Sequence, residues 1–184
     1  MNEFVFRYDS YGLGSATVTL SDGNQDVIFD ASYIGRNPLG DLLEAVAEMF
    51  CNNQDHCKLH WISEPGILRL NIKKKNGEAH ILVEEYDEDI DYRKVGDDQW
   101  GTKLDAVMTV KRLADAVVSE AERNLRLHGL VGFSEDWCDH VDVFPISAYL
   151  RLKGIVSRFG DNDLRTSSLE EELAMLRGIL KQDE

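Results

Sequence analysis

The chain has 184 residues, of which 43% are hydrophobic, and this suits one globular domain with a core of its own. Its formal net charge of −14 at pH 7 disfavours nucleic acid and anionic membranes as partners, and suits either simple solubility or a basic protein partner. Three cysteines cannot all pair within one chain, which favours a reducing, cytoplasmic location, and no apolar run is long enough to span a bilayer.

The first half of the chain predicts six strands and one helix. Apolar and polar residues alternate in short runs, as in half-buried strands, and turn dipeptides such as Asp22-Gly23 and Asn76-Gly77 separate these runs. The helix begins at Asn37-Pro38, because Asn caps a helix well and Pro loses nothing at the first helical position. The predicted strands cover residues 3–8, 15–20, 25–33, 58–63, 67–73 and 78–86. This β-β-β-α-β-β-β order predicts an α+β fold with one antiparallel sheet of five to six strands, packed by the helix.

The second half of the chain predicts helices, over residues 104–127, 145–155 and 169–180. Gly129 is expected to cap the long first helix at its C-terminal end. Ser168 and Glu171 have the spacing of a capping box at the start of the last helix. We therefore expect residues 1–100 to form the sheet with its helix, and residues 101–184 to form a helical part packed on it within the same domain.

Residues 84–98 are the most concentrated charge feature of the chain, and the candidate docking loop, which we call the acidic segment, covers residues 87–100. Within residues 84–98, eight acidic side chains stand against Arg93 and Lys94, a net charge of −6. Aromatic residues are interleaved with the carboxylates, a composition typical of a surface that docks a basic partner, although a plain solubilising loop has the same acidity. The candidate partner-binding residues are Asp87, Glu88, Asp89, Asp91, Tyr92, Asp97, Asp98 and Trp100.

The cysteines and histidines lack a metal-binding pattern. Cys51 and Cys57 do not have the close spacing of paired zinc ligands, and His56 and His60, on one strand, would lie about 13 Å apart. Nothing in the sequence places Cys138 near them, so whether these side chains meet in space stays open. We therefore predict no metal ion and no other cofactor.

Catalysis has little support in the sequence, which contains no G-x-S-x-G, no H-E-x-x-H and no phosphate-binding loop, so no catalytic residue is predicted. The alternative interpretation is an enzyme or small-ligand-binding protein with a pocket between sheet and helices. Its candidate residues are Glu64, Glu84, Cys138 and His140. A further option is a homo-oligomer formed through the last helix. The apolar residues on that helix are Leu173, Met175, Leu176 and Leu180.

Three short motifs resemble a group of uncharacterised bacterial proteins. They are Ala31-Ser32-Tyr33 at a strand end, Leu39-Gly40-Asp41-Leu42-Leu43 at a helix start, and Trp61-Ile62-Ser63-Glu64-Pro65-Gly66 in a hairpin. The motifs are structural, and the resemblance implies no activity. At the level of fold alone, the layout is also similar to immunity proteins that neutralise basic toxins. The favoured interpretation is a non-enzymatic, cytoplasmic protein-binding module, immunity-like or antitoxin-like, that docks a basic partner through its acidic segment.

Overall fold

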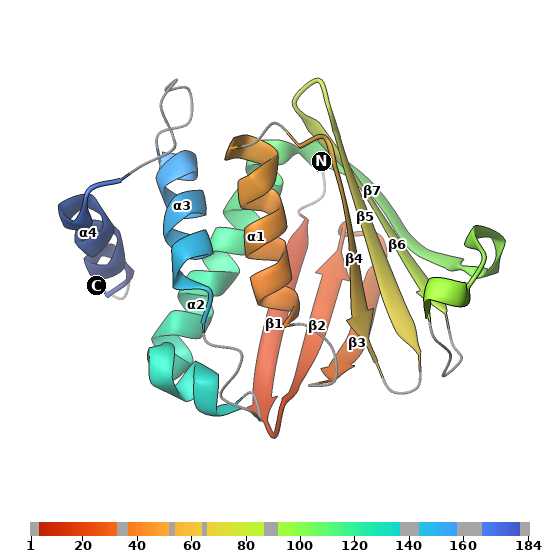
Figure 1. Ribbon diagram of the computed structural model, residues 1–184, viewed down its shortest axis with the longest axis horizontal. Helices are drawn as coiled ribbons and strands as arrows, with labels where there is room; N and C mark the ends of the chain where they lie inside the picture. Colours follow the sequence, from red (N-terminus) through yellow and green to blue (C-terminus); the bar gives the residue numbers. More distant parts are fainter. Residues whose placement is uncertain are drawn as a thin grey trace.

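The computed structural model describes residues 4–32, 37–51, 54–63, 66–86, 92–136, 144–157 and 167–180. These residues form an α+β fold with two antiparallel sheets and four α-helices (Figure 1). The strands are β1 (Val5–Gly12), β2 (Ser15–Ser21), β3 (Asp26–Ser32), β4 (His56–Ile62), β5 (Ile67–Lys75), β6 (Glu78–Tyr86) and β7 (Gly101–Thr109). The helices are α1 (Pro38–Cys51), α2 (Val110–Asp136), α3 (Ile146–Ser157) and α4 (Leu169–Ile179).

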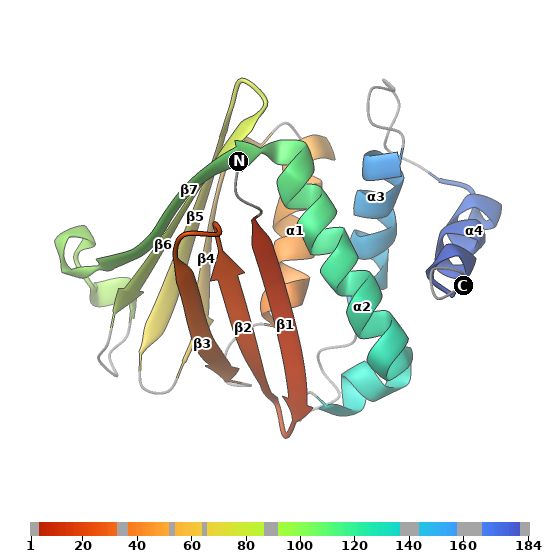
Figure 2. The same cartoon turned by 180° about the vertical axis from the view of Figure 1, so that it is seen from behind.

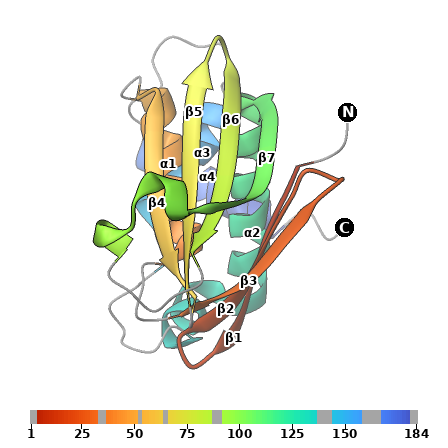
Figure 3. The same ribbon diagram turned by 90° about the vertical axis from the view of Figure 1, so that its right-hand side faces the viewer.

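The strands form two sheets, and the prediction of one sheet of five to six strands was wrong. One sheet has the order β1-β2-β3 and the other the order β4-β5-β6-β7. Figure 3 shows the strands of the two sheets running at a steep angle to each other. Where β3 meets β4, the sheets touch through side chains: Phe29 stacks on Trp61 with ring centroids 5.6 Å apart. Alternation along a strand indicates which face is buried, but not which strands pair, and pairing decides the number of sheets.

Strand β7 replaces the first turns of the predicted long helix, which was a second error. Leu104 and Met108 are buried and pair with β6, whereas Val107 between them is 62% exposed. All three residues fit a helical stripe as well as a strand, so the periodicity of the sequence was ambiguous here. The helix α2 begins only at Val110, where the Thr109 hydroxyl accepts a hydrogen bond from the Arg112 backbone N–H at 3.2 Å.

The predicted N-terminal caps are confirmed, but α2 continues to Asp136, beyond the predicted end of the long helix at residue 127. The side-chain oxygen of Asn37 accepts from the backbone N–H groups of Leu39 (3.0 Å) and Gly40 (3.2 Å) at the start of α1. The capping box of Ser168 opens α4. Helix α2 breaks at Gly129, whose φ of +66° lies in the left-handed region that favours glycine.

The hydrophobic core draws side chains from both sheets and from all four helices. Helices α1, α2 and α3 pack against one another on one side of the four-stranded sheet (Figure 1). Trp61 is fully buried in this core, as expected, and its indole N–H donates to the Asp41 carboxylate at 3.1 Å. Among the described residues, no helix has the length and apolar character needed to cross a membrane.

Candidate binding surfaces

The outer face of the four-stranded sheet carries a buried ion pair. Arg69 on β5 stands directly opposite Glu84 on β6, and their exposed fractions are only 6% and 8%. The guanidinium makes a bidentate contact, with Nε to Oε2 at 2.8 Å and Nη2 to Oε1 at 3.0 Å. The Asn71 amide donates a third hydrogen bond to Oε2 at 2.7 Å. Because its carboxylate is paired and hydrogen-bonded, Glu84 tolerates burial on this face.

The same guanidinium holds the C-terminal end of the acidic segment. Its Nη1 donates to the Asp97 carboxylate at 2.6 Å, and this hydrogen bond holds the pKa of Asp97 below its usual value. Its Cζ atom also lies 4.3 Å from the centre of the Trp100 ring, in a cation–π contact. Figure 3 shows the short turns before β7 crossing in front of β4 and β5. Arg69 therefore fastens this end of the segment onto the sheet.

Aromatic neighbours close the site around Trp100. The rings of His60 on β4 and Tyr86 on β6 lie 6.1 Å and 6.0 Å from the Trp100 ring. Burial, together with the nearby charges of Lys58 and Arg69, lowers the pKa of His60. A neutral His60 at pH 7 avoids adding a second positive charge beside the guanidinium.

The structure describes part of the predicted partner-binding set. Asp97 and Asp98 are exposed, whereas Trp100 is 8% exposed and packs against Arg69, His60 and Tyr86. The backbone of Tyr92 lies in a short 3-10 turn, Tyr92–Lys94. The four acidic positions from 87 to 91 lie outside the described residues.

Sequence reasoning missed Arg69, although a signal was present. The two-residue turn Asn76-Gly77, in which both residues have positive φ, pairs Lys75 with Glu78. Counting six residues outward along both strands from this pair places Arg69 opposite Glu84. A charged residue flanked by apolar ones in a strand, facing an opposite charge at that register, would have indicated a buried pair.

Of the residues proposed for a pocket between sheet and helices, the structure describes Glu84 alone, which lies on the outer face of the four-stranded sheet. Glu84 is held by Arg69 and Asn71, and residues 64, 138 and 140 lie outside the described residues. Among the described side chains, no group of three His, Cys, Asp or Glu residues converges as a metal-binding set. Cys57 is buried, and burial raises the pKa of its thiol to about 11, so it is a poor nucleophile at neutral pH.

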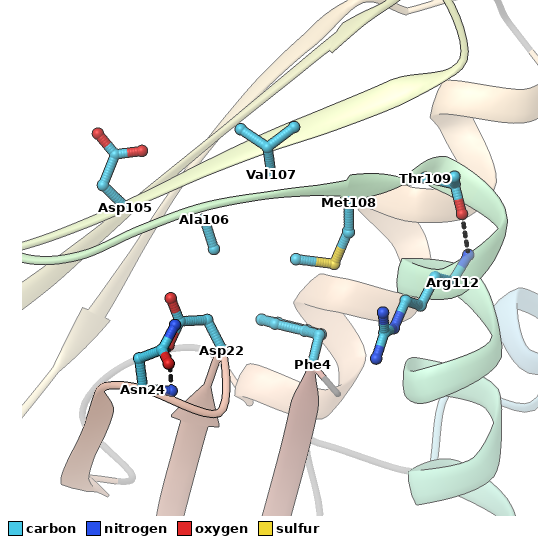
Figure 4. Close-up of a pocket in the computed structure, with 9 residues that line it drawn as sticks. All are labelled: Phe4, Asp22, Asn24, Asp105, Ala106, Val107, Met108, Thr109 and Arg112. Atoms are coloured by element: carbon cyan, nitrogen blue, oxygen red, sulfur yellow. Dashed lines mark hydrogen bonds between the residues drawn. The ribbon is translucent and has the colours of Figure 1, made fainter. Parts of the chain in front are cut away.

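Two hollows lie at the other side of the molecule, where β1 begins. One has a volume of about 430 Å³ and lies between the Asp22–Asn24 turn and β7 (Figure 4). In Figure 4 the Phe4 ring and the Met108 thioether point toward each other, and the Arg112 side chain extends beside Phe4. The second hollow, of about 480 Å³, lies between β1 and α2 and shares Phe4 and Arg112 with the first. Figure 2 shows α2 running alongside β1.

No protein-family model, curated protein or solved structure matches this chain. Its function is therefore inferred from its own geometry and chemistry.

Proposed function

We propose that this protein is a non-enzymatic binding module that docks a basic protein partner through its acidic segment. The proposal rests on the way Arg69 fastens the end of that segment to the sheet. Burying a guanidinium costs free energy unless it is paired. Arg69 is paired with the buried Glu84 and also with Asp97, which lies in an exposed turn. A loop that serves only solubility needs no such fastening, because its position is irrelevant to that task.

A fastened segment also binds at lower entropic cost than a free one. Ordering a loop on association reduces affinity, and a segment that is already held avoids part of this cost. The exposed carboxylates of Asp97 and Asp98, within a chain of net charge −14, attract a basic surface over several ångströms of solvent. We place this module in the bacterial cytoplasm, with an immunity-like or antitoxin-like role against its basic partner.

The test is capture of a partner by the tagged chain at low and high salt. The segment variant, Asp89→Asn, Asp91→Asn and Asp98→Asn, is compared with a control that loses three exposed carboxylates elsewhere. The control carries Asp26→Asn, Glu78→Gln and Glu170→Gln. We expect the parent chain and the control variant to capture a basic protein at low salt, and the segment variant not to capture it. Capture should also be lost at high salt, because salt screens the charge pairs across an interface. Capture of no protein, or equal capture by the two variants, contradicts the proposal.

A second proposal is self-association through α4. This helix buries Ile179 and part of Leu176 against the core, but leaves Leu169, Leu173 and Leu180 exposed. Of the four residues predicted to pair across a two-fold axis, Leu173 and Leu180 therefore have exposed apolar surface to offer, whereas Leu176 is used internally. Exposed apolar side chains grouped on one short helix favour a contact with a second copy.

A further inference from the structure

The hollow between β1 and α2 is positively charged in an otherwise acidic protein. Four arginines line it, against the two acidic residues Asp115 and Glu120. The arginines are Arg7, Arg112, Arg123 and Arg126. The lining itself has a net charge of +2, while the whole chain carries −14. Asp9 beside it pairs with Arg7 at 3.5 Å and with Arg123 at 2.7 Å, so the groove with Asp9 included keeps a net charge of +1. The positive potential of such a groove favours the binding of an anionic ligand.

The sequence of α2 builds one wall of this groove. Arg112, Ala116, Ser119, Arg123 and Arg126 follow one another at steps of four, three, four and three residues, which places them on one face of the helix. The two small residues in the middle of the stripe leave the hollow open between the arginines. From the first arginine to the last, the stripe is about 21 Å long at a rise of about 1.5 Å per residue.

The other wall is β1, whose edge is partly satisfied by side chains of α2. The buried Glu120 carboxylate, 5% exposed, accepts from the Tyr8 backbone N–H at 2.7 Å. Arg123 and Asn124 donate to the Tyr8 carbonyl oxygen at 2.6 Å and 3.1 Å. At Tyr8, therefore, α2 takes the place that a neighbouring strand would otherwise occupy.

Further toward the start of β1, this substitution ends. Backbone groups two residues apart in a strand point the same way, so the N–H and C=O of Phe6 face the same edge as those of Tyr8. Within the described part of the chain, no side chain of α2 makes a hydrogen bond to Phe6 of the kind it makes to Tyr8. The groove thus presents a donor and an acceptor of the sheet edge beside its arginines.

We propose that this groove binds an extended acidic segment of a partner protein. The segment adds a short strand to β1, with its backbone paired to Phe6. Over the open part of β1 its carboxylates meet Arg7 and Arg112, because alternate side chains of a strand point the same way and guanidinium groups bind carboxylates well. The added strand ends before Tyr8, where Glu120, Arg123 and Asn124 already occupy the edge.

The neighbouring hollow gives the segment a place for one apolar residue. It joins the groove at Phe4 and Arg112, and its inner surface is formed by the Phe4 ring, Ala106 and Met108 (Figure 4). A carboxylate is disfavoured at that end, where the Asp22 side chain lines the hollow. The segment therefore has acidic residues over α2 and an apolar residue beside β7.

The probe is an N-acetylated, fluorescein-labelled peptide of alternating Glu and Val, eight residues long, titrated with the full chain at low salt. The groove variant Arg7→Gln/Arg112→Gln is compared with Lys75→Gln/Arg177→Gln, which removes two exposed positive charges elsewhere. We expect about tenfold weaker binding by the groove variant, since each charge-assisted pair is worth about a factor of three or more, and less than about twofold change in the control. No binding by the parent chain, or equal losses in the two variants, overturns the proposal.

Strand addition is tested with two further peptides of the same sequence. One is N-methylated at the odd-numbered backbone amides and the other at the even-numbered ones. Only one register removes the N–H groups that pair with β1, so one methylated peptide loses binding while the other keeps it. Equal binding by both methylated peptides would show that the backbone is not paired and would refute the strand. A single-stranded oligonucleotide of equal charge serves as the competing class. If it binds as tightly and is equally sensitive to the groove variant, the groove recognises charge alone and the peptide assignment is wrong.

Discussion

Removing only one partner of the Arg69–Glu84 pair is expected to destabilise the fold strongly. Arg69→Met keeps the length of the side chain but leaves Glu84, 8% exposed, with the single hydrogen bond from Asn71. Breaking a buried ion pair from one side costs about 3–5 kcal/mol. Because the Asn71 hydrogen bond survives, we expect a loss of unfolding free energy near the lower end of this range, about 3 kcal/mol. Such a loss multiplies the unfolded-to-folded ratio about 160-fold.

The double variant Arg69→Met/Glu84→Leu separates the loss of pairing from the loss of volume. With both charges gone, no uncompensated carboxylate stays buried, and we expect a cost of about 1 kcal/mol or less. Urea unfolding followed by tryptophan fluorescence measures both variants, provided that the slope of free energy against urea is unchanged. A single variant within about 1 kcal/mol of the parent, or a double variant as unstable as the sum of the two single ones, would refute the reasoning.

Three further predictions concern single features of the chain. Asn37→Ala removes the cap of α1 and should lower the free energy of unfolding by about 1–2 kcal/mol; an unchanged melting temperature would contradict this. Burial raises the pKa of the Cys57 thiol from 9.0 to about 11, which leaves less reactive thiolate at pH 8. In a variant with Cys51 and Cys138 replaced by Ser, folded Cys57 should therefore react with Ellman's reagent at pH 8 about 100-fold more slowly than Cys57 unfolded in urea. Because the unfolded thiol ionises first, stability should also fall above pH 9, and equal rates in both states would exclude the burial effect. Truncation after Asp163 should turn an oligomer into a monomer on a sizing column, and an unchanged elution volume would exclude α4 as the contact.

Local signals in the sequence were sufficient for most of the elements. The turn Asn76-Gly77 adopts positive φ at both residues, as a two-residue hairpin requires, and Asn37 and Ser168 cap the helices that they were predicted to cap. Each of these features depends only on residues within a few positions of one another. Such short-range contacts are encoded directly in the order of the side chains.

The division into two sheets depends on contacts that the sequence pattern does not contain. Strand β3 could have paired with β4, and instead meets it through the Phe29–Trp61 contact. Strand β7 shows the same limit, because Leu104 and Met108 are compatible with both a strand and a helix. The open edge of β6 favours a strand at Leu104–Met108, because the edge gains a full ladder of hydrogen bonds from a strand and none from a helix.

For the candidate sites too, the sequence indicated local features but not the long-range contacts. Composition alone made Asp97 and Trp100 candidates. It did not indicate that the indole is buried, or that Arg69, 28 residues before Asp97, holds the carboxylate. The arginine stripe on α2 was visible in the sequence as a helical spacing. Its meaning required β1, because Glu120 contacts the backbone of Tyr8, 112 residues away in sequence.

The two proposed surfaces have opposite charge and share no residue, so they should act independently. The acidic segment is held at Asp97 by Arg69 of β5, whereas the arginine groove lies between β1 and α2. Substitutions that share no partner generally have additive free energies. Neutralising Asp98 should therefore leave binding of the Glu-Val peptide within about twofold, and Arg112→Gln should leave capture of the basic partner unchanged. If either substitution alters binding at the other surface by more than about fivefold, the two surfaces are coupled, and a single partner that contacts both becomes the simpler explanation.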